Sequence, residues 1–88
     1  MAEVIHESSA RIIARDGASY RPIVMGEQQA DGAWHGWIEF QPTASGSPAR
    51  TGRETTQVSR GALEYWATGL EATYFDGAFD RANPLVRA

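Results

Sequence analysis

The dipeptide Asp31-Gly32 constrains the fold of this chain more than any other feature, because it separates two stretches rich in strand-forming residues. Asp-Gly supplies the positive φ angles that a two-residue type I′ hairpin turn requires. Pro22 lies near the start of the first stretch and Pro42 closes the second, where a missing amide is tolerated. The sequence therefore predicts a β-hairpin from Tyr20 to Phe40.

A two-residue turn fixes which side chains share a face of the hairpin, because side chains alternate along a strand. One face is apolar and is expected to form the core; its cross-strand pairs are Gln29 with Trp34, Met25 with Ile38 and Ile23 with Phe40. The other face is mixed; its pairs are Gln28 with His35, Gly26 with Trp37 and Val24 with Glu39. Ile23, Met25, Ile38 and Phe40 are therefore expected to lie beneath the helices.

The segments that flank the hairpin contain weaker signals. Residues 10–15 favour a short first strand over a helical turn. Residues 42–48 have the composition of a surface loop, and residues 49–57 contain three threonines and no large apolar residue, which favours an edge strand. Residues 1–9 and 83–88 lack a sustained periodic pattern and are expected to be mobile ends.

The C-terminal third predicts two short helices. Ser59 is a good N-cap for a helix that begins at Arg60, and its apolar positions recur at spacings of three and four residues. Gly69 fits a left-handed cap that ends this helix after Thr68. A second helix is expected over 71–82, with apolar stripes that widen the buried surface.

These elements predict one α+β domain spanning residues 1–88: a small antiparallel β-meander of three to four strands, with two short C-terminal helices packed on one face. A chain of 88 residues can bury one thin core, and an apolar content of 42% is typical of globular proteins rather than disordered segments.

Composition excludes several classes of chemistry. The absence of cysteine removes disulfides, thiolate zinc ligands and cysteine nucleophiles. Since no apolar run approaches the length of a membrane span and the first residues lack a signal-peptide pattern, we expect a cytoplasmic protein without a membrane partner. The formal net charge of −3 disfavours bulk binding to nucleic acid.

Three segments of the chain, residues 34–40 (WHGWIEF), 53–57 (RETTQ) and 62–71 (ALEYWATGLE), resemble a family of short bacterial proteins of unknown function. The resemblance extends over most of the chain after Tyr20. Since no activity, ligand or catalytic residue is assigned to that family, the resemblance implies none for this chain.

His35, Trp37 and Glu39 alternate along one strand and are expected on the mixed face of the hairpin. A histidine and a carboxylate on one face can share a proton or bind a metal, and a tryptophan can stack on a ring. The simpler interpretation is cross-strand packing, with Trp37 over Gly26 and His35 hydrogen-bonded or solvated. Two ligands do not make a zinc site, so no metal, cofactor or catalytic residue is predicted.

Arg50, Arg53 and Arg60 approach the predicted N-terminus of the first helix, where free amides and the helix dipole favour an anion. Two interpretations remain open for this cluster. It either binds a phosphate or carboxylate, or it forms a solvated ion-pair patch in which Glu54 is an internal partner.

The chain is rich in aromatic residues for one thin core, and tryptophan, tyrosine and arginine dominate the binding energy of protein interfaces. We therefore expect a non-enzymatic protein that acts through contacts with another protein or with itself, as a subunit, adaptor, inhibitor or homodimer. A single-stranded nucleic-acid binder that uses Trp37 and the Arg50, Arg53 and Arg60 patch is one alternative. A small-ligand protein or enzyme built around His35 and Glu39 is another.

Overall fold

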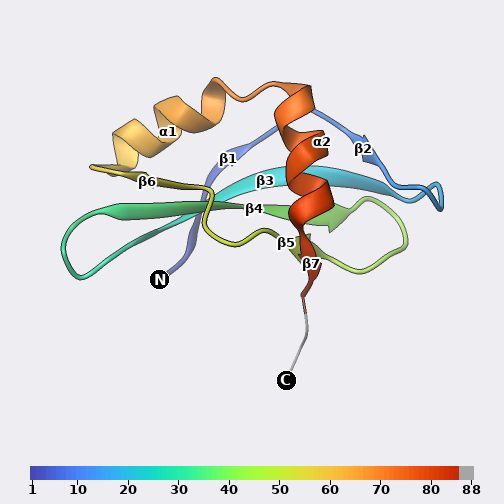
Figure 1. Cartoon of the computed structure of the whole chain (residues 1–88), viewed down its shortest axis with the longest axis horizontal. Helices are drawn as coiled ribbons and strands as arrows, with labels where there is room; N and C mark the ends of the chain where they lie inside the picture. Colours follow the sequence, from blue (N-terminus) through green and yellow to red (C-terminus); the bar gives the residue numbers. More distant parts are fainter. Residues whose placement is uncertain (86–88) are drawn as a thin grey trace.

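The β3–β4 hairpin is the centre of the fold, and both helices lie on one side of it (Figure 1). Strand β3 spans Ser19–Gln28 and β4 spans Trp34–Pro42. The structure is a computed structural model that describes residues 1–85. Within these residues seven strands form one open antiparallel sheet, so the predicted α+β fold is confirmed, with more strands than expected.

The hairpin turn contains three residues rather than two, and this shifts the register by one. The Gln29 N–H donates to the Ala33 carbonyl at 2.7 Å, and the Gly32 N–H donates to the Gln29 carbonyl at 2.9 Å. Gly32 has a φ of 91°, as in a type I turn followed by a left-handed residue. Because Ala30 belongs to the turn, β3 pairs Val24 with Ile38 instead of with Glu39.

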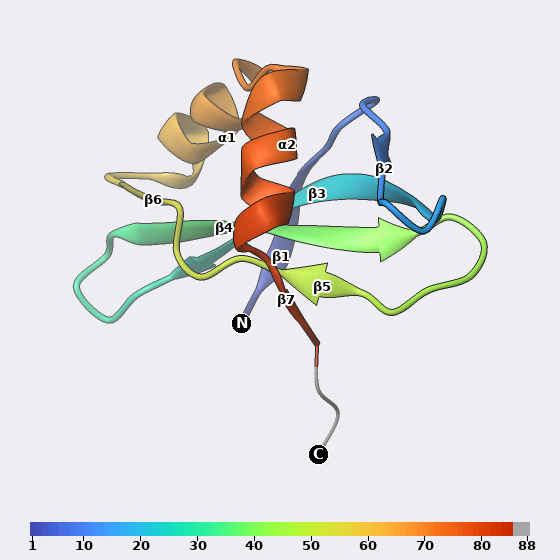
Figure 2. The same cartoon turned by 45° about the vertical axis from the view of Figure 1, so that its right-hand side comes forward.

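This shift reverses the two faces of β3 but not those of β4. Ile38 and Phe40 lie in the core beneath the helices, as predicted, and Val24 joins them. The prediction for Ile23 and Met25 was wrong, because these side chains are partly exposed on the opposite face. We call that opposite face, which the helices leave uncovered, the open face (Figure 2).

The N-terminal residues belong to the sheet. Strand β1 (Glu3–Glu7) pairs with one end of β3, with a bulge between Val4 and His6. Strand β2 (Ile12–Ile13) pairs with the other end of β3 and agrees with the expected first strand. The expectation of a mobile end over residues 1–9 is therefore corrected, because Glu3–Glu7 form a strand that pairs with β3.

The predicted edge strand over 49–57 is divided into β5 (Ala49–Arg50) and β6 (Thr55–Gln57), which both pair with β4. Thr51 separates them: its hydroxyl accepts a hydrogen bond from the Ile38 N–H at 3.1 Å. A further short strand, β7 (Asn83–Pro84), pairs with β5. Part of the C-terminal end that was expected to be mobile is thus a strand, whereas positions 86–88 lie outside the described residues.

Helices α1 (Arg60–Thr68) and α2 (Ala72–Arg81) cover the core face of the sheet. The Ser59 hydroxyl accepts a hydrogen bond from the Ala62 N–H at 3.1 Å, which confirms the predicted N-cap. The helix ends after Thr68 as expected, but the left-handed cap was wrong, because Gly69 has a φ of −88°. Its N–H instead bonds to carbonyls of the last helical turn, a geometry that needs no positive φ.

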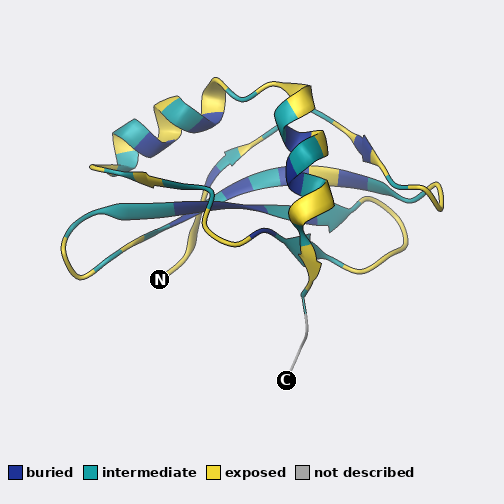
Figure 3. Cartoon of the chain, viewed as in Figure 1, coloured by how far each residue is buried: buried dark blue, intermediate teal, exposed yellow. Residues whose placement is uncertain are grey.

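Two glycines let α1 approach the sheet closely. Gly26 and Gly36 are cross-strand partners, and Leu63 of α1 lies over both. A Cβ atom at Gly26 would lie 2.5 Å from Leu63 Cδ2, and one at Gly36 would lie 2.7 Å from Leu63 Cδ1. Leu63 is fully buried as a result, and the buried side of α1 faces the hairpin (Figure 3).

Candidate interaction face

Apolar side chains occupy positions of the open face where an antiparallel sheet usually carries polar ones. Val4 pairs with Met25, and Met25 pairs with Trp37, so the three form a row across β1, β3 and β4. Val4 is 49% exposed, and Ile13, which pairs with Ser19 at the other end of β3, is 66% exposed. Ile23, in the next row of β3, joins Val4, Met25 and Trp37 in an apolar band, whereas Ile13 lies apart from it beyond Arg21.

Trp37 lies at the centre of this face and is held by two charged neighbours. The Arg50 guanidinium stacks over the indole at 4.5 Å from the ring centroid, and the indole N–H donates to Glu39 Oε2 at 3.2 Å. Arg50 and Glu39 are themselves cross-strand partners. Its cross-strand neighbour on β3 is Met25 rather than the predicted Gly26. Because Trp37 is only 6% exposed, its ring is not an open platform for stacking a base.

His35 and Glu39 lie on the open face, as predicted, but they do not act as a pair. They are four residues apart on β4, about 13 Å at the rise of a strand, with Trp37 between them. His35 lies opposite Glu27 on one side and Thr56 on the other. Within residues 1–85, no three histidine, cysteine or acidic residues are grouped as metal ligands would be.

The structure does not gather the three predicted arginines into one patch. Arg50 stacks on Trp37, and Arg60 donates to Glu3 and Glu64 at 2.7 Å in each case. Arg53 is exposed in the segment between β5 and β6. β1, which carries the partner of Arg60, and β5, which carries Arg50, are three strand spacings apart, about 14 Å.

Glu54 was expected to be an internal partner of Arg50, Arg53 and Arg60, but its partners lie in α2. Arg81 Nη2 and the Tyr74 hydroxyl both donate to Glu54 Oε1, each at 2.5 Å. Burial alone raises the pKa of the Glu54 carboxyl, but the hydrogen bonds from Arg81 and Tyr74 outweigh burial and hold the pKa below 4.5. Burial and the bond to Glu54 raise the pKa of Tyr74 to about 12. These contacts join α2 to the segment before β6.

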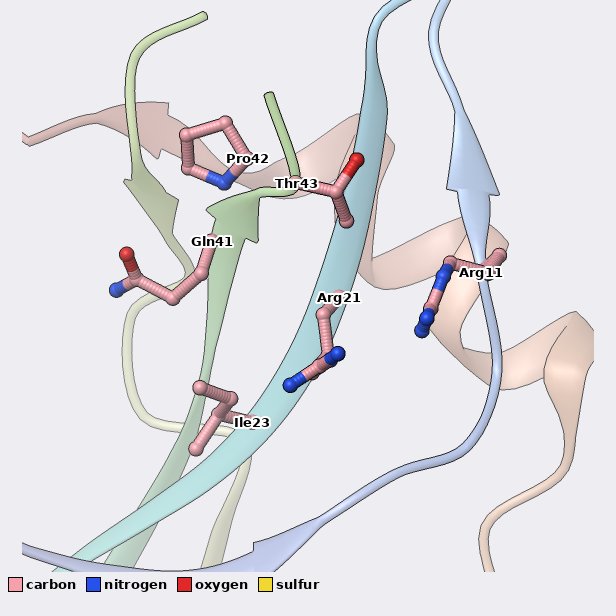
Figure 4. Close-up of a pocket in the computed structure, with 6 residues that line it drawn as sticks. All are labelled: Arg11, Arg21, Ile23, Gln41, Pro42 and Thr43. Atoms are coloured by element: carbon pink, nitrogen blue, oxygen red, sulfur yellow. The ribbon is translucent and has the colours of Figure 1, made fainter. Parts of the chain in front are cut away.

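A hollow of about 410 Å³ opens at one end of the open face, and none of the predicted site residues lines it (Figure 4). Its lining residues are Arg11, Arg21, Ile23, Gln41, Pro42 and Thr43. The sequence shows these arginines but not their proximity, because Arg11 reaches the hollow only through the pairing of β2 with β3. With the observed register of β3, alternation along the strand places both Arg21 and Ile23 on the open face.

No family model, curated protein or solved structure matches this chain. None of the helices in residues 1–85 is long and apolar enough to cross a membrane. The function is therefore argued from the geometry of the open face and its hollow.

Proposed function

We propose that this chain is a non-enzymatic interaction protein that binds another protein through the open face of its sheet. The observation that carries the proposal is the apolar band at positions that alternate with the core. Burial of its exposed side chains against a partner contributes roughly 25 cal/mol per Å² of apolar surface removed from water.

The neighbourhood of Trp37 supports the same proposal. Arg50 and Glu39 hold the indole in one orientation, so a partner that packs over this cluster orders few additional side chains. Tryptophan and arginine are also the residue types most enriched at the energetic centres of protein interfaces. The nucleic-acid alternative has less support, because the Trp37 ring is covered and the three arginines are separated.

The test uses two double variants that add the same charge at exposed apolar residues. Val4→Glu with Ile13→Glu alters the open face, whereas Val58→Glu with Tyr65→Glu alters exposed residues before and within α1. Proteins captured from a lysate of the source organism by the wild type are identified, and their affinity for each variant is then measured with purified components. Mass in solution at micromolar concentration tests binding to a second copy.

The open-face variant is expected to weaken partner binding at least about tenfold, the equivalent of 1.4 kcal/mol, whereas the α1 variant binds normally. The opposite pattern would place the interface on α1 and contradict the proposal. A wild-type protein that is monomeric and captures nothing would also contradict it.

A further inference from the structure

The hollow at the end of the open face contains an arrangement of arginines that needs an explanation. The β2–β3 register pairs Ile12 with Tyr20, and continuing it by one residue brings Arg11 beside Arg21. Arg21 is in turn the partner of Gln41 on β4. Arg11, directly before β2, therefore lies in a row with Arg21 of β3 and Gln41 of β4, with Arg21 in the middle (Figure 4).

This row places the positive charges of Arg11 and Arg21 next to each other. In the part of the chain that is described, the ion pairs involve Arg60, Arg81 and the N-terminal amine, and neither Arg11 nor Arg21 takes part in one. Like charges on neighbouring strands are destabilising. An anion bound between the two guanidinium groups would remove that cost and satisfy their donors.

We propose that the hollow binds the carboxylate of an acidic side chain of the partner protein. Arg11 and Arg21 donate to the two carboxylate oxygens, and the Gln41 amide provides a further donor. Ile23 and the Pro42 ring line the same hollow and contact the methylene stem of the acidic side chain. The inference rests on the proposed function, since it assigns the chemistry of the partner that meets the open face.

The charges around the hollow favour a carboxylate over a phosphate. Ile23, which lines the hollow, pairs with Glu39 on one side and with Glu7 on the other. The carboxyl groups of Glu7 and Glu39 thus lie in the neighbouring row, on either side of Ile23, and neither forms an ion pair with Arg11 or Arg21. A phosphate that approaches a charge of −2 would be repelled by these acids more strongly than a monoanionic carboxylate.

The probe for this inference is the capped dipeptide acetyl-Glu-Leu-amide, titrated into the intact ¹⁵N-labelled protein. Its uncharged analogue acetyl-Gln-Leu-amide and inorganic phosphate are titrated in parallel. The arginine Nε–H signals and the amide signal of Ile23 report binding. Arg11→Gln and Arg21→Gln remove the proposed donors, and Arg15→Gln, at an exposed position outside the hollow, is the matched control.

We expect the glutamate peptide to shift the signals of Arg11, Arg21 and Ile23, and each hollow variant to weaken its binding about tenfold. Arg15→Gln should leave that affinity unchanged. Equal binding of the glutamine peptide, tighter binding of phosphate, or loss of binding in Arg15→Gln would overturn the inference.

Failure of the carboxylate site can be distinguished from failure of the proposed function. If the partner is lost with Val4→Glu and Ile13→Glu but binds normally to the Arg11→Gln and Arg21→Gln double variant, the open face is an interface and the carboxylate site is wrong. If all of these variants bind the partner normally, both proposals fail.

Discussion

Glu54 shows how single residues join the two layers of this fold. Its side chain is one-tenth exposed, and its carboxylate accepts hydrogen bonds from Tyr74 and Arg81, which both belong to α2. Its own N–H donates to the Gly36 carbonyl on β4 at 2.8 Å. One residue in an irregular segment therefore fixes the position of a helix relative to the central hairpin.

The lowered pKa of Glu54 predicts a loss of stability in acid. Since the folded protein favours the ionised carboxyl, this contribution is fully present above the pKa of the unfolded chain, near 4.5, and is lost as the pH falls through the lower folded pKa. Glu54→Gln should cost about 1 kcal/mol near neutral pH, because Arg81 is half exposed and its bonds are partly screened.

Urea denaturation at a series of pH values measures this effect. The difference between the wild type and Glu54→Gln should shrink as the pH falls below 4.5. Asp76→Asn, which removes an exposed carboxyl from α2, is the control and should behave as the wild type. A difference that stays constant with pH would contradict the account of Glu54.

Tyr74, whose hydroxyl donates to Glu54, provides a second test of these contacts. Its pKa of about 12 predicts a tyrosine that ionises about two pH units above the ordinary value of 10. Because the neutral phenol is favoured in the folded protein, its contribution is present below pH 10 and is lost as the pH rises to 12. In an ultraviolet absorbance titration, Tyr74→Phe should remove this late phase; a late phase that persists would assign it to another tyrosine.

At the scale of secondary structure, the paired glycines of the hairpin set the distance between α1 and the sheet. A methyl group at Gly26 would press against the fully buried Leu63 and against Ile5 at 2.8 Å. Overpacking of this kind costs about 1–3 kcal/mol. Gly26→Ala is therefore expected to destabilise the protein by that amount in thermal or urea denaturation.

Gly77→Ala is the matched control for this prediction. Gly77 lies within α2, and a Cβ atom there would approach no atom more closely than Arg81 Nη1 at 3.4 Å. Replacing a helical glycine by alanine should stabilise the protein by about 0.5–1 kcal/mol. Equal effects of the two substitutions would show that close packing of Leu63 on Gly26 does not determine the position of α1.

The hairpin also shows what sequence patterns predict and what they leave open. The turn at Asp31-Gly32, the first helix and its Ser59 N-cap follow from local chemistry, and all three are present. Asp-Gly, however, fits both a two-residue turn and a three-residue turn with Gly32 left-handed, and only packing selects between them. Choosing the shorter turn moved Ile23 and Met25 to the wrong face.

Long-range pairing explains most of what the sequence did not predict at the candidate site. The stacking of Arg50 on Trp37 depends on β4–β5 pairing, and the hollow depends on β2–β3 pairing. Neither pairing leaves a periodic signal in a strand of two residues. His35, Trp37 and Glu39 were placed on the correct face because alternation along β4 does not depend on the turn.

In the molecule as a whole, the two faces of the sheet differ in their covering. Both helices bury the core face, and the open face presents an apolar band next to a basic hollow. This asymmetry is the basis for assigning binding of another protein to the open face. The two faces also contain different reporter side chains, so contact with a partner can be observed on each separately.

The most direct test is a spectrum of the protein labelled at its methionine methyl groups and tryptophan indoles, recorded with the captured partner or at rising protein concentration. Met25 and Trp37 lie on the open face, whereas Trp34 and Trp66 pack against the core beneath the helices. We predict that saturating partner shifts the Met25 methyl and Trp37 indole signals and leaves those of Trp34 and Trp66 in place. Unchanged Met25 and Trp37 signals in a saturated complex would contradict binding through the open face.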